Sequence, residues 1–185
     1  MIDELREYQF TEQAWERYWQ LFQTCCLPIR GNDYGALLGM WQEQVDNCIY
    51  FSHLWRYQSF DERTRLRAEL GKVKAWREAF LPQAAPLVSR QFLQLLNPRS
   101  EVELCKARFV HSYRCATGTA SAVIDRIHRS VDASGQPCCG VWTTEFSDPN
   151  QVLVMTAGAQ TPLSTLEAAV SIESRRIEPL MARCS

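Results

Sequence analysis

The stretch that decides the fold occurs twice in this chain, as LGMWQEQV at residues 38–45 and as CGVWTTEF at residues 139–146. The glycine and the tryptophan of the first copy recur at a constant distance, since 140 − 39 and 142 − 41 both equal 101. A polar loop precedes each copy, and a turn-forming run follows it. A motif that is repeated at one offset indicates a chain built from two related units.

The sequence around the first copy predicts a strand–helix–strand–strand–helix–strand unit. One helix is expected to start at the N-cap Thr11, and a second at the capping box that opens with Ser59. Pro28, Gly71 and Pro82 are expected to interrupt or end helical segments, because proline lacks the amide donor and glycine is flexible. The expected strands are residues 2–10, 34–44, 48–57 and 91–96.

The sequence around the second copy predicts the same order of strands and helices. Its expected strands are residues 106–115, 138–146, 151–157 and 177–183, and its expected helices are residues 117–131 and 162–175. The order β-α-β-β-α-β is that of a ferredoxin-like unit, in which the helices cover only one face of the sheet. The other face is too apolar here to stay in contact with water.

We therefore predict an α+β fold made of two tandem ferredoxin-like βαββαβ units. The first unit is expected over residues 1–96 and the second over residues 105–185, with residues 97–104 as the linker. Their two sheets are expected to bury their bare faces against each other and so to form an α/β barrel of the dimeric type within one chain.

Composition excludes several classes of function. The formal net charge of the 185 residues is −1, which gives no basic face for nucleic acid or an anionic membrane. No apolar run reaches the roughly 18 residues of a membrane span, and the first residues do not read as a secretory signal, so the expected compartment is the cytoplasm. The eight cysteines lack the spacing of zinc ligands and are expected to be free thiols, with no metal site.

The first half resembles the NIPSNAP family. The resemblance is carried by ELREY at residues 4–8, GMW at residues 39–41 and HLWRYQSFDER at residues 53–63, and it covers most of the first 96 residues. The second half keeps only Gly140-x-Trp142 and the general layout, without counterparts of the histidine and tryptophan in HLWRY. The resemblance implies a dimeric α/β-barrel fold, related in shape to cofactor-free monooxygenases, haem-degrading proteins and small cyclases. It implies no particular catalytic residue.

Alternation along the expected strands gives a candidate site. Strand residues two apart share a face of the sheet, and the aromatic and polar residues that we expect to line one cavity come from both halves: Arg6, Tyr8, Trp41, Glu43, His53, His111, Tyr113 and Trp142. Imidazole and carboxylate groups exchange protons, so His53, His111 and Glu43 are the candidate catalytic residues. The other five are candidates for substrate binding. The alternative for each is a structural role, as a core aromatic, a satisfied buried histidine or a salt-bridged arginine.

These features predict a small-molecule enzyme that acts on an apolar substrate in the barrel cavity. No dinucleotide-binding glycine pattern, nucleophile elbow or phosphate-binding loop is present in the sequence, so no cofactor is expected. The reaction is expected to be of the cofactor-free oxygenase, isomerase or cyclase type. The alternatives are a non-catalytic protein that binds a ligand or a partner, and a haem-binding protein. No nucleic-acid partner is expected, and a homo-oligomer is left open.

Overall fold

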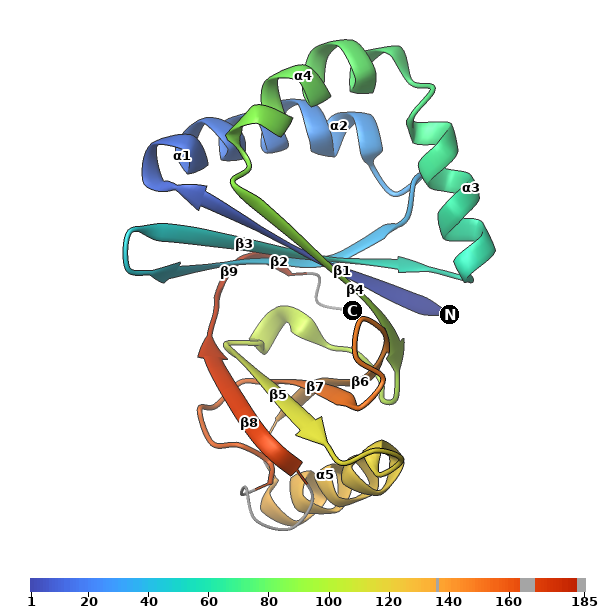
Figure 1. Ribbon diagram of the computed structural model, residues 1–185, viewed down its shortest axis with the longest axis vertical. Helices are drawn as coiled ribbons and strands as arrows, with labels where there is room; N and C mark the ends of the chain where they lie inside the picture. Colours follow the sequence, from blue (N-terminus) through green and yellow to red (C-terminus); the bar gives the residue numbers. More distant parts are fainter. Residues whose placement is uncertain (136, 164–168, 183–185) are drawn as a thin grey trace. The chain divides into compact units, whose positions relative to one another are not determined.

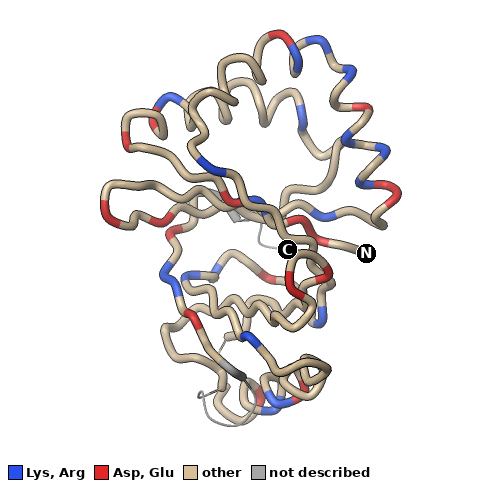
Figure 2. Tube along the Cα trace, in the orientation of Figure 1, with Lys and Arg blue, Asp and Glu red and all other residues tan. Residues whose placement is uncertain are grey.

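The computed structural model describes residues 1–135, 137–163 and 169–182. Contacts within the chain divide it into unit 1, Met1–Leu93, and unit 2, Gln94–Ser185. Figure 1 shows the elements of each unit, and Figure 2 shows that basic and acidic residues are interspersed along the chain in both units. Each unit is described by itself below.

Unit 1 has the predicted strand and helix order. Its strands are β1 (Ile2–Thr11), β2 (Ala36–Val45), β3 (Cys48–Tyr57) and the beginning of β4 (Arg90–Pro98). They lie in the order β4-β1-β3-β2, and β3 pairs antiparallel with both β1 and β2. Helical segments cover one face of this sheet (Figure 1). They are α1 (Glu12–Leu21), η1 (Phe22–Cys26), α2 (Leu27–Arg30), α3 (Phe60–Leu70), η2 (Trp76–Phe80), α4 (Leu81–Ala84) and η3 (Ala85–Leu87).

The two predicted helix starts of unit 1 are confirmed by their hydrogen bonds. Thr11 Oγ1 accepts a hydrogen bond from the amide of Ala14 at 3.3 Å, and Ser59 Oγ accepts one from the amide of Glu62 at 3.1 Å. Each hydroxyl satisfies an amide that has no partner within the first turn of its helix. Gly71 caps α3 after Leu70, as predicted.

The prediction that Pro28 and Pro82 end or interrupt their helices is wrong, because a π-helical turn precedes each proline. In η1 the amide of Leu27 bonds to the carbonyl of Phe22, and in η2 the amide of Leu81 bonds to the carbonyl of Trp76. Each proline then falls in the first turn of a short α-helix, α2 or α4, where its missing amide hydrogen is not needed. The helical path therefore continues through both prolines.

Unit 2 repeats the strand order of unit 1. Its elements are η4 (Leu104–Lys106), β5 (Phe109–Cys115), α5 (Ala120–Ser134), β6 (Cys138–Phe146), β7 (Gln151–Thr156), β8 (Ala169–Arg176) and β9 (Glu178–Ala182). The strands lie in the order β8-β5-β7-β6, which corresponds one to one with β4-β1-β3-β2. The last residues of β4, from Leu95 to Pro98, pair with β6.

The helix predicted over residues 162–175 is wrong in its second half. Ala169–Arg176 form strand β8, which pairs with β5, and a further strand, β9, follows it. The strand predicted at residues 177–183 is confirmed as β9, and β8 precedes it as a strand that was not predicted. Ile172 lies between Ser171 and Glu173, and this alternation of apolar and polar residues is the two-residue period of a strand. Residues 161–163, where the helix was expected to start, are not helical, and residues 164–168 lie outside the described part of the chain.

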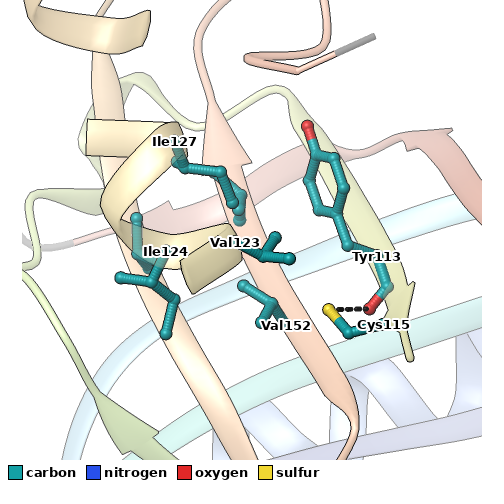
Figure 3. Packing of buried hydrophobic residues seen from close by; sticks show 8 residues of the cluster. Tyr113, Cys115, Val123, Ile124, Ile127 and Val152 are labelled. Carbon is teal, nitrogen blue, oxygen red and sulfur yellow. Dashed lines mark hydrogen bonds between the residues drawn. The ribbon is translucent and has the colours of Figure 1, made fainter. Parts of the chain in front are cut away.

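The core of unit 2 lies between α5 and its sheet. Val123 and Ile127 of α5 are fully buried against Tyr113 of β5, Val141 of β6 and Val152 of β7. Figure 3 shows these side chains of α5 turned toward the strands. The predicted helical stripe of residues 117–131 therefore packs as expected, although the helix starts three residues later.

A β-bulge explains why the Gly-x-Trp motif repeats. The pairing register shifts just before Gly39 in β2 and just before Gly140 in β6. Each tryptophan ring then folds back over the glycine: a Cβ atom on Gly39 would lie 2.5 Å from the ring of Trp41, and one on Gly140 would meet Trp142 in the same way. Only glycine leaves room for this ring position.

Candidate active site

Unit 1 contains a cavity of about 510 Å³ between its sheet and its helical segments. The sheet contributes Arg6 and Tyr8 from β1 and His53 from β3. The two π-helical turns form part of the walls, with Phe22 and Cys26 in η1 and Trp76 and Phe80 in η2. The exposed residues Ser89, Arg90 and Gln91 lie at its rim. Such π-turns are frequent at functional sites.

The strand register separates the predicted site residues of unit 1 into two sets. Arg6 of β1 lies opposite His53 of β3, so the two share the face covered by the helices. Trp41 lies opposite Ser52 and therefore on the other face. Glu43 lies opposite Tyr50, which also places it on that other face. Arg6, Tyr8 and His53 come together as predicted, whereas Trp41 and Glu43 do not join them.

His53 is held as a neutral hydrogen-bond donor. Its ring is 2% exposed and stacks on Phe51, and its Nδ1 accepts a hydrogen bond from Trp55 Nε1 at 2.5 Å. Burial lowers the pKa of His53 well below 6.5, and the nearby charges of Arg6 and Arg30 lower it further. In a neutral ring with Nδ1 accepting, the proton is on Nε2. None of the described residues accepts a hydrogen bond from Nε2.

Arg30 is a buried guanidinium without an acidic partner in the described part of the chain. Its Nη2 donates to Tyr57 Oη at 2.7 Å and to the carbonyl of Tyr34 at 3.2 Å, and its Nε donates to the same carbonyl at 3.3 Å. The guanidinium carbon lies 3.4 Å from the centre of the Trp55 ring. Burial lowers the pKa of Arg30. Among residues 1–135, 137–163 and 169–182, none accepts a hydrogen bond from Nη1.

Arg6 shares one buried carboxylate with two other arginines. Its Nη1 donates to Glu4 at 2.8 Å and its Nε to Tyr8 Oη at 2.8 Å, while Nη2 finds no acceptor among the described residues. Glu4 also pairs with Arg63 and, at 3.4 Å, with Arg67. Burial alone would raise the pKa of Glu4, but these arginines hold it below the ordinary value. One carboxylate therefore faces three guanidiniums here, and Arg30 adds a fourth positive charge.

The predicted site residues of unit 2 are buried within that unit. His111 is fully buried, with Nδ1 at 2.9 Å from Ser174 Oγ and Nε2 at 2.8 Å from Thr156 Oγ1. Both ring nitrogens therefore have a hydrogen-bond partner. Tyr113 packs under α5, and its hydroxyl accepts a hydrogen bond from the amide of Leu163. Trp142 is fully buried over Gly140.

The prediction that His53 lines a cavity together with His111 and Tyr113 is wrong. His53 faces the helical segments of its own unit, where it contacts Phe22. Arg30 was missed because Pro28 was expected to end the helix, which left Arg30 in a loop. Its position before Gly31, which caps α2, was the one signal in the sequence that could have placed it at a helix end.

Cys26 lines the cavity as a thiol, since burial raises its pKa to about 12. The seven described cysteines are all free thiols, and Cys184 lies outside the described residues. Within the described ranges, no three His, Cys, Asp or Glu side chains gather in a way that could hold a metal ion. No helix among the described residues is long and apolar enough to cross a membrane.

Comparison with known proteins agrees with this architecture. The family model described as NIPSNAP matches residues 3–100. Protein NipSnap homolog 3A of Homo sapiens is 28% identical over 134 residues, which cover 66% of this chain and 53% of that protein. The same protein of Pongo abelii matches equally well. The chain thus spans about half the length of the curated relatives it matches.

Two solved structures resemble the chain over 99% of its length. One is a monooxygenase-like protein from Lactobacillus acidophilus, with a TM-score of 0.63 at 11% identity and 95% of that chain covered. The other is an anthrone oxidase-like protein, with a TM-score of 0.57 at 10% identity and 92% covered. At these identities the likeness concerns the fold alone. It confirms the predicted class, the α+β fold of dimeric α/β-barrel proteins, as a tandem with a divergent second unit.

Proposed function

Since the chain belongs to the NIPSNAP family, we propose that it is a small-molecule enzyme whose active site is the cavity of unit 1. The observation that carries this proposal is a set of hydrogen-bond donors around the cavity with no acceptors among the described residues: His53 Nε2, Arg6 Nη2 and Arg30 Nη1. Donors that are held in place around a cavity stabilise negative charge that develops on a substrate.

The chemistry follows from these charges. A weakly acidic substrate, such as an enol or a phenol, ionises more easily when positive groups surround its oxygen, because these groups stabilise the anion more than the neutral form. The proton that is lost passes to bulk water. The apolar walls hold the body of the substrate. The resulting anion is rich in electrons, so it can react with dioxygen, as in an oxygenase, or take a proton back at another atom, as in an isomerase.

His53 is assigned the role of donor rather than base. To accept a proton at Nε2 the ring would have to carry its other proton on Nδ1, which would then face the N–H of Trp55. The same conflict arises if Nε2 binds the iron of a haem, so the surroundings of His53 do not fit haem ligation.

The oxygenase reaction is the first to test, because one protein of similar fold is described as anthrone oxidase-like. We expect the wild-type protein to accelerate dioxygen uptake by anthrone above the rate in buffer, as measured with an oxygen electrode. His53→Leu is expected to lose this acceleration. Arg65→Gln is the matched control, because Arg65 is exposed and its ion-pair partner among the described residues is Glu69, one turn further along α3.

A non-catalytic ligand-binding protein is the second candidate. One observation favours it: among the described residues that line the cavity there is no carboxylate, and the one imidazole has its Nδ1 occupied by Trp55. The cavity therefore offers no ready base. Binding of anthrone or of ionisable phenols without any acceleration of their oxidation or isomerisation would favour this candidate over the enzyme.

A further inference from the structure

We propose that the natural ligand of the unit 1 cavity is an organic carboxylate, with its carboxylate group bound to Arg30 and His53. This inference rests on the proposed function in that it takes the same cavity as the site. It goes further because it names the charged group of the ligand and the residues that bind it.

The first argument is charge. Arg30 is 4% exposed, and its partners among the described residues are neutral, namely Tyr34, Tyr57 and the ring of Trp55. A buried charge without a counter-ion is costly to the folded protein. Glu4 attracts Arg30 electrostatically, but its two oxygens are already paired with three other arginines. An anionic ligand group would supply the missing negative charge.

The second argument is geometry. Arg30 and His53 both contact the indole of Trp55, since Arg30 lies over its ring and His53 accepts the hydrogen bond from its Nε1. Both residues also line the cavity of unit 1, so Trp55 fixes two side chains that still have a donor to offer there, Arg30 Nη1 and His53 Nε2. A carboxylate has two oxygens, one for each donor. Because Tyr34, Tyr57 and Trp55 already hold the guanidinium in place, little side-chain freedom is lost on binding.

The third argument concerns the rest of the ligand. Phe22, Leu70, Phe80 and Ala84 are buried and line the same cavity. They bind an apolar body but offer no further polar partner. A volume of about 510 Å³ suits a small organic molecule. A carboxylate on an aromatic or other apolar body satisfies both parts of the cavity.

A matched pair of compounds tests the inference on the intact chain. 2-Naphthoate and 2-naphthamide have almost the same shape, but only the first is charged at pH 7.5. In isothermal titration calorimetry, we expect the wild-type protein to bind naphthoate at least about tenfold more tightly than the amide, as charge-assisted hydrogen bonds are about twice as strong as neutral ones. Arg30→Gln should remove this preference and keep the affinity for the amide. Arg65→Gln should leave both affinities unchanged.

Each other outcome overturns the inference in a distinguishable way. Equal affinities in the wild-type protein would show that the cavity does not select a carboxylate but would leave it as the site of an uncharged substrate. A preference that survives Arg30→Gln would place the carboxylate elsewhere. Failure of both compounds to bind would count against the cavity as the active site as well. If Arg30→Gln does not fold, the wild-type comparison of the two compounds still decides the question.

Discussion

At the scale of the residue, the site depends on the tautomer of His53. Trp55 donates to Nδ1, and this one bond turns the ring into a donor toward the cavity. The same bond links the site to the stability of the fold, since Trp55 is fully buried and has its indole N–H directed at His53. The effect of a substitution at position 53 should therefore be measured on ligand binding and on the free energy of unfolding in the same variant.

Replacing His53 by two different residues separates these effects. His53→Leu removes the acceptor for Trp55 and should lower the free energy of unfolding by about 1–3 kcal/mol, with loss of naphthoate selectivity. In His53→Gln the side-chain carbonyl can accept from Trp55 while the amide group donates, so the loss of stability should stay below about 1 kcal/mol. Urea denaturation measures the stability of both variants. Equal stability of the two would show that the Trp55 bond is unimportant.

The buried histidines should also make stability depend on pH. Burial lowers the pKa of His53 and His111 below 6.5, so the unfolded chain takes up protons at a higher pH than the folded one. Their contribution to stability is complete above pH 6.5 and is lost as the pH falls toward and through the lower folded pKa values.

We therefore expect the free energy of unfolding to decrease between pH 7 and pH 5, by at most about 1.4 kcal/mol per pH unit for each proton taken up. The lowered pKa of Glu4 acts only below its ordinary value of 4.5, outside this window. Chemical denaturation at several pH values measures the slope, and His53→Gln should reduce it. A slope that is identical in this variant would mean that His53 is not the titrating group.

At the scale of the element, β2 and β6 each contain a bulge over whose glycine a tryptophan ring packs. Gly140→Ala puts a methyl group where the ring of Trp142 lies and should lower the free energy of unfolding by about 1–3 kcal/mol through overpacking. Gly158→Ala is the matched control: no atom lies within 4 Å of its added methyl group, and its effect should stay within about 0.5 kcal/mol. Combining Gly140→Ala with Trp142→Leu should recover part of the loss. Additive effects of the two changes would contradict this picture.

The elements that could be predicted from sequence are those set by local chemistry. Thr11 and Ser59 start helices because their hydroxyls bond to nearby amides, and the Gly-x-Trp repeat marks two bulged strands. The helical path through Pro28 could not be predicted, because nothing in the local pattern reveals a π-turn. Thr161 and Pro162 resemble the start of a helix, and the local pattern did not reveal that a strand begins at Ala169.

The candidate site was predicted in part for a related reason. The two-residue period of a strand shows which of its own residues share a face, and so Arg6 and Tyr8 were correctly placed together. It does not show which face the helices cover, nor how neighbouring strands are aligned. Trp41 and Glu43 were for that reason assigned to the wrong face relative to His53.

At the scale of the whole molecule, the two units share a topology but differ in their chemistry. In unit 2, His111 stands where unit 1 has Arg6, and Val154, which lies opposite it, stands where unit 1 has His53. Thr156 takes the place of Trp55 and bonds to His111. Val154 belongs to the apolar cluster under α5. The set of donors that surrounds the unit 1 cavity is therefore not reproduced at these positions.

This asymmetry predicts the stoichiometry of binding. Calorimetric titration with 2-naphthoate should give one site per chain, because Arg30, His53 and Trp55 occur together only in unit 1. Two equal sites per chain would mean that unit 2 binds carboxylates by another set of residues. The Arg30→Gln variant should then lose one site and retain the other, which identifies the contribution of each unit.

The two residues of each glycine–tryptophan pair also depend on each other. If the glycine of a pair mutates first, the new side chain collides with the indole; if the tryptophan mutates first, a large void opens above the glycine. Neither partner can drift alone without passing through a less stable intermediate. This mutual dependence holds in both pairs, Gly39 with Trp41 and Gly140 with Trp142. The positions of Arg6 and His53 carry His111 and Val154 in unit 2, so the likeness of the two units is clearest at the buried bulges.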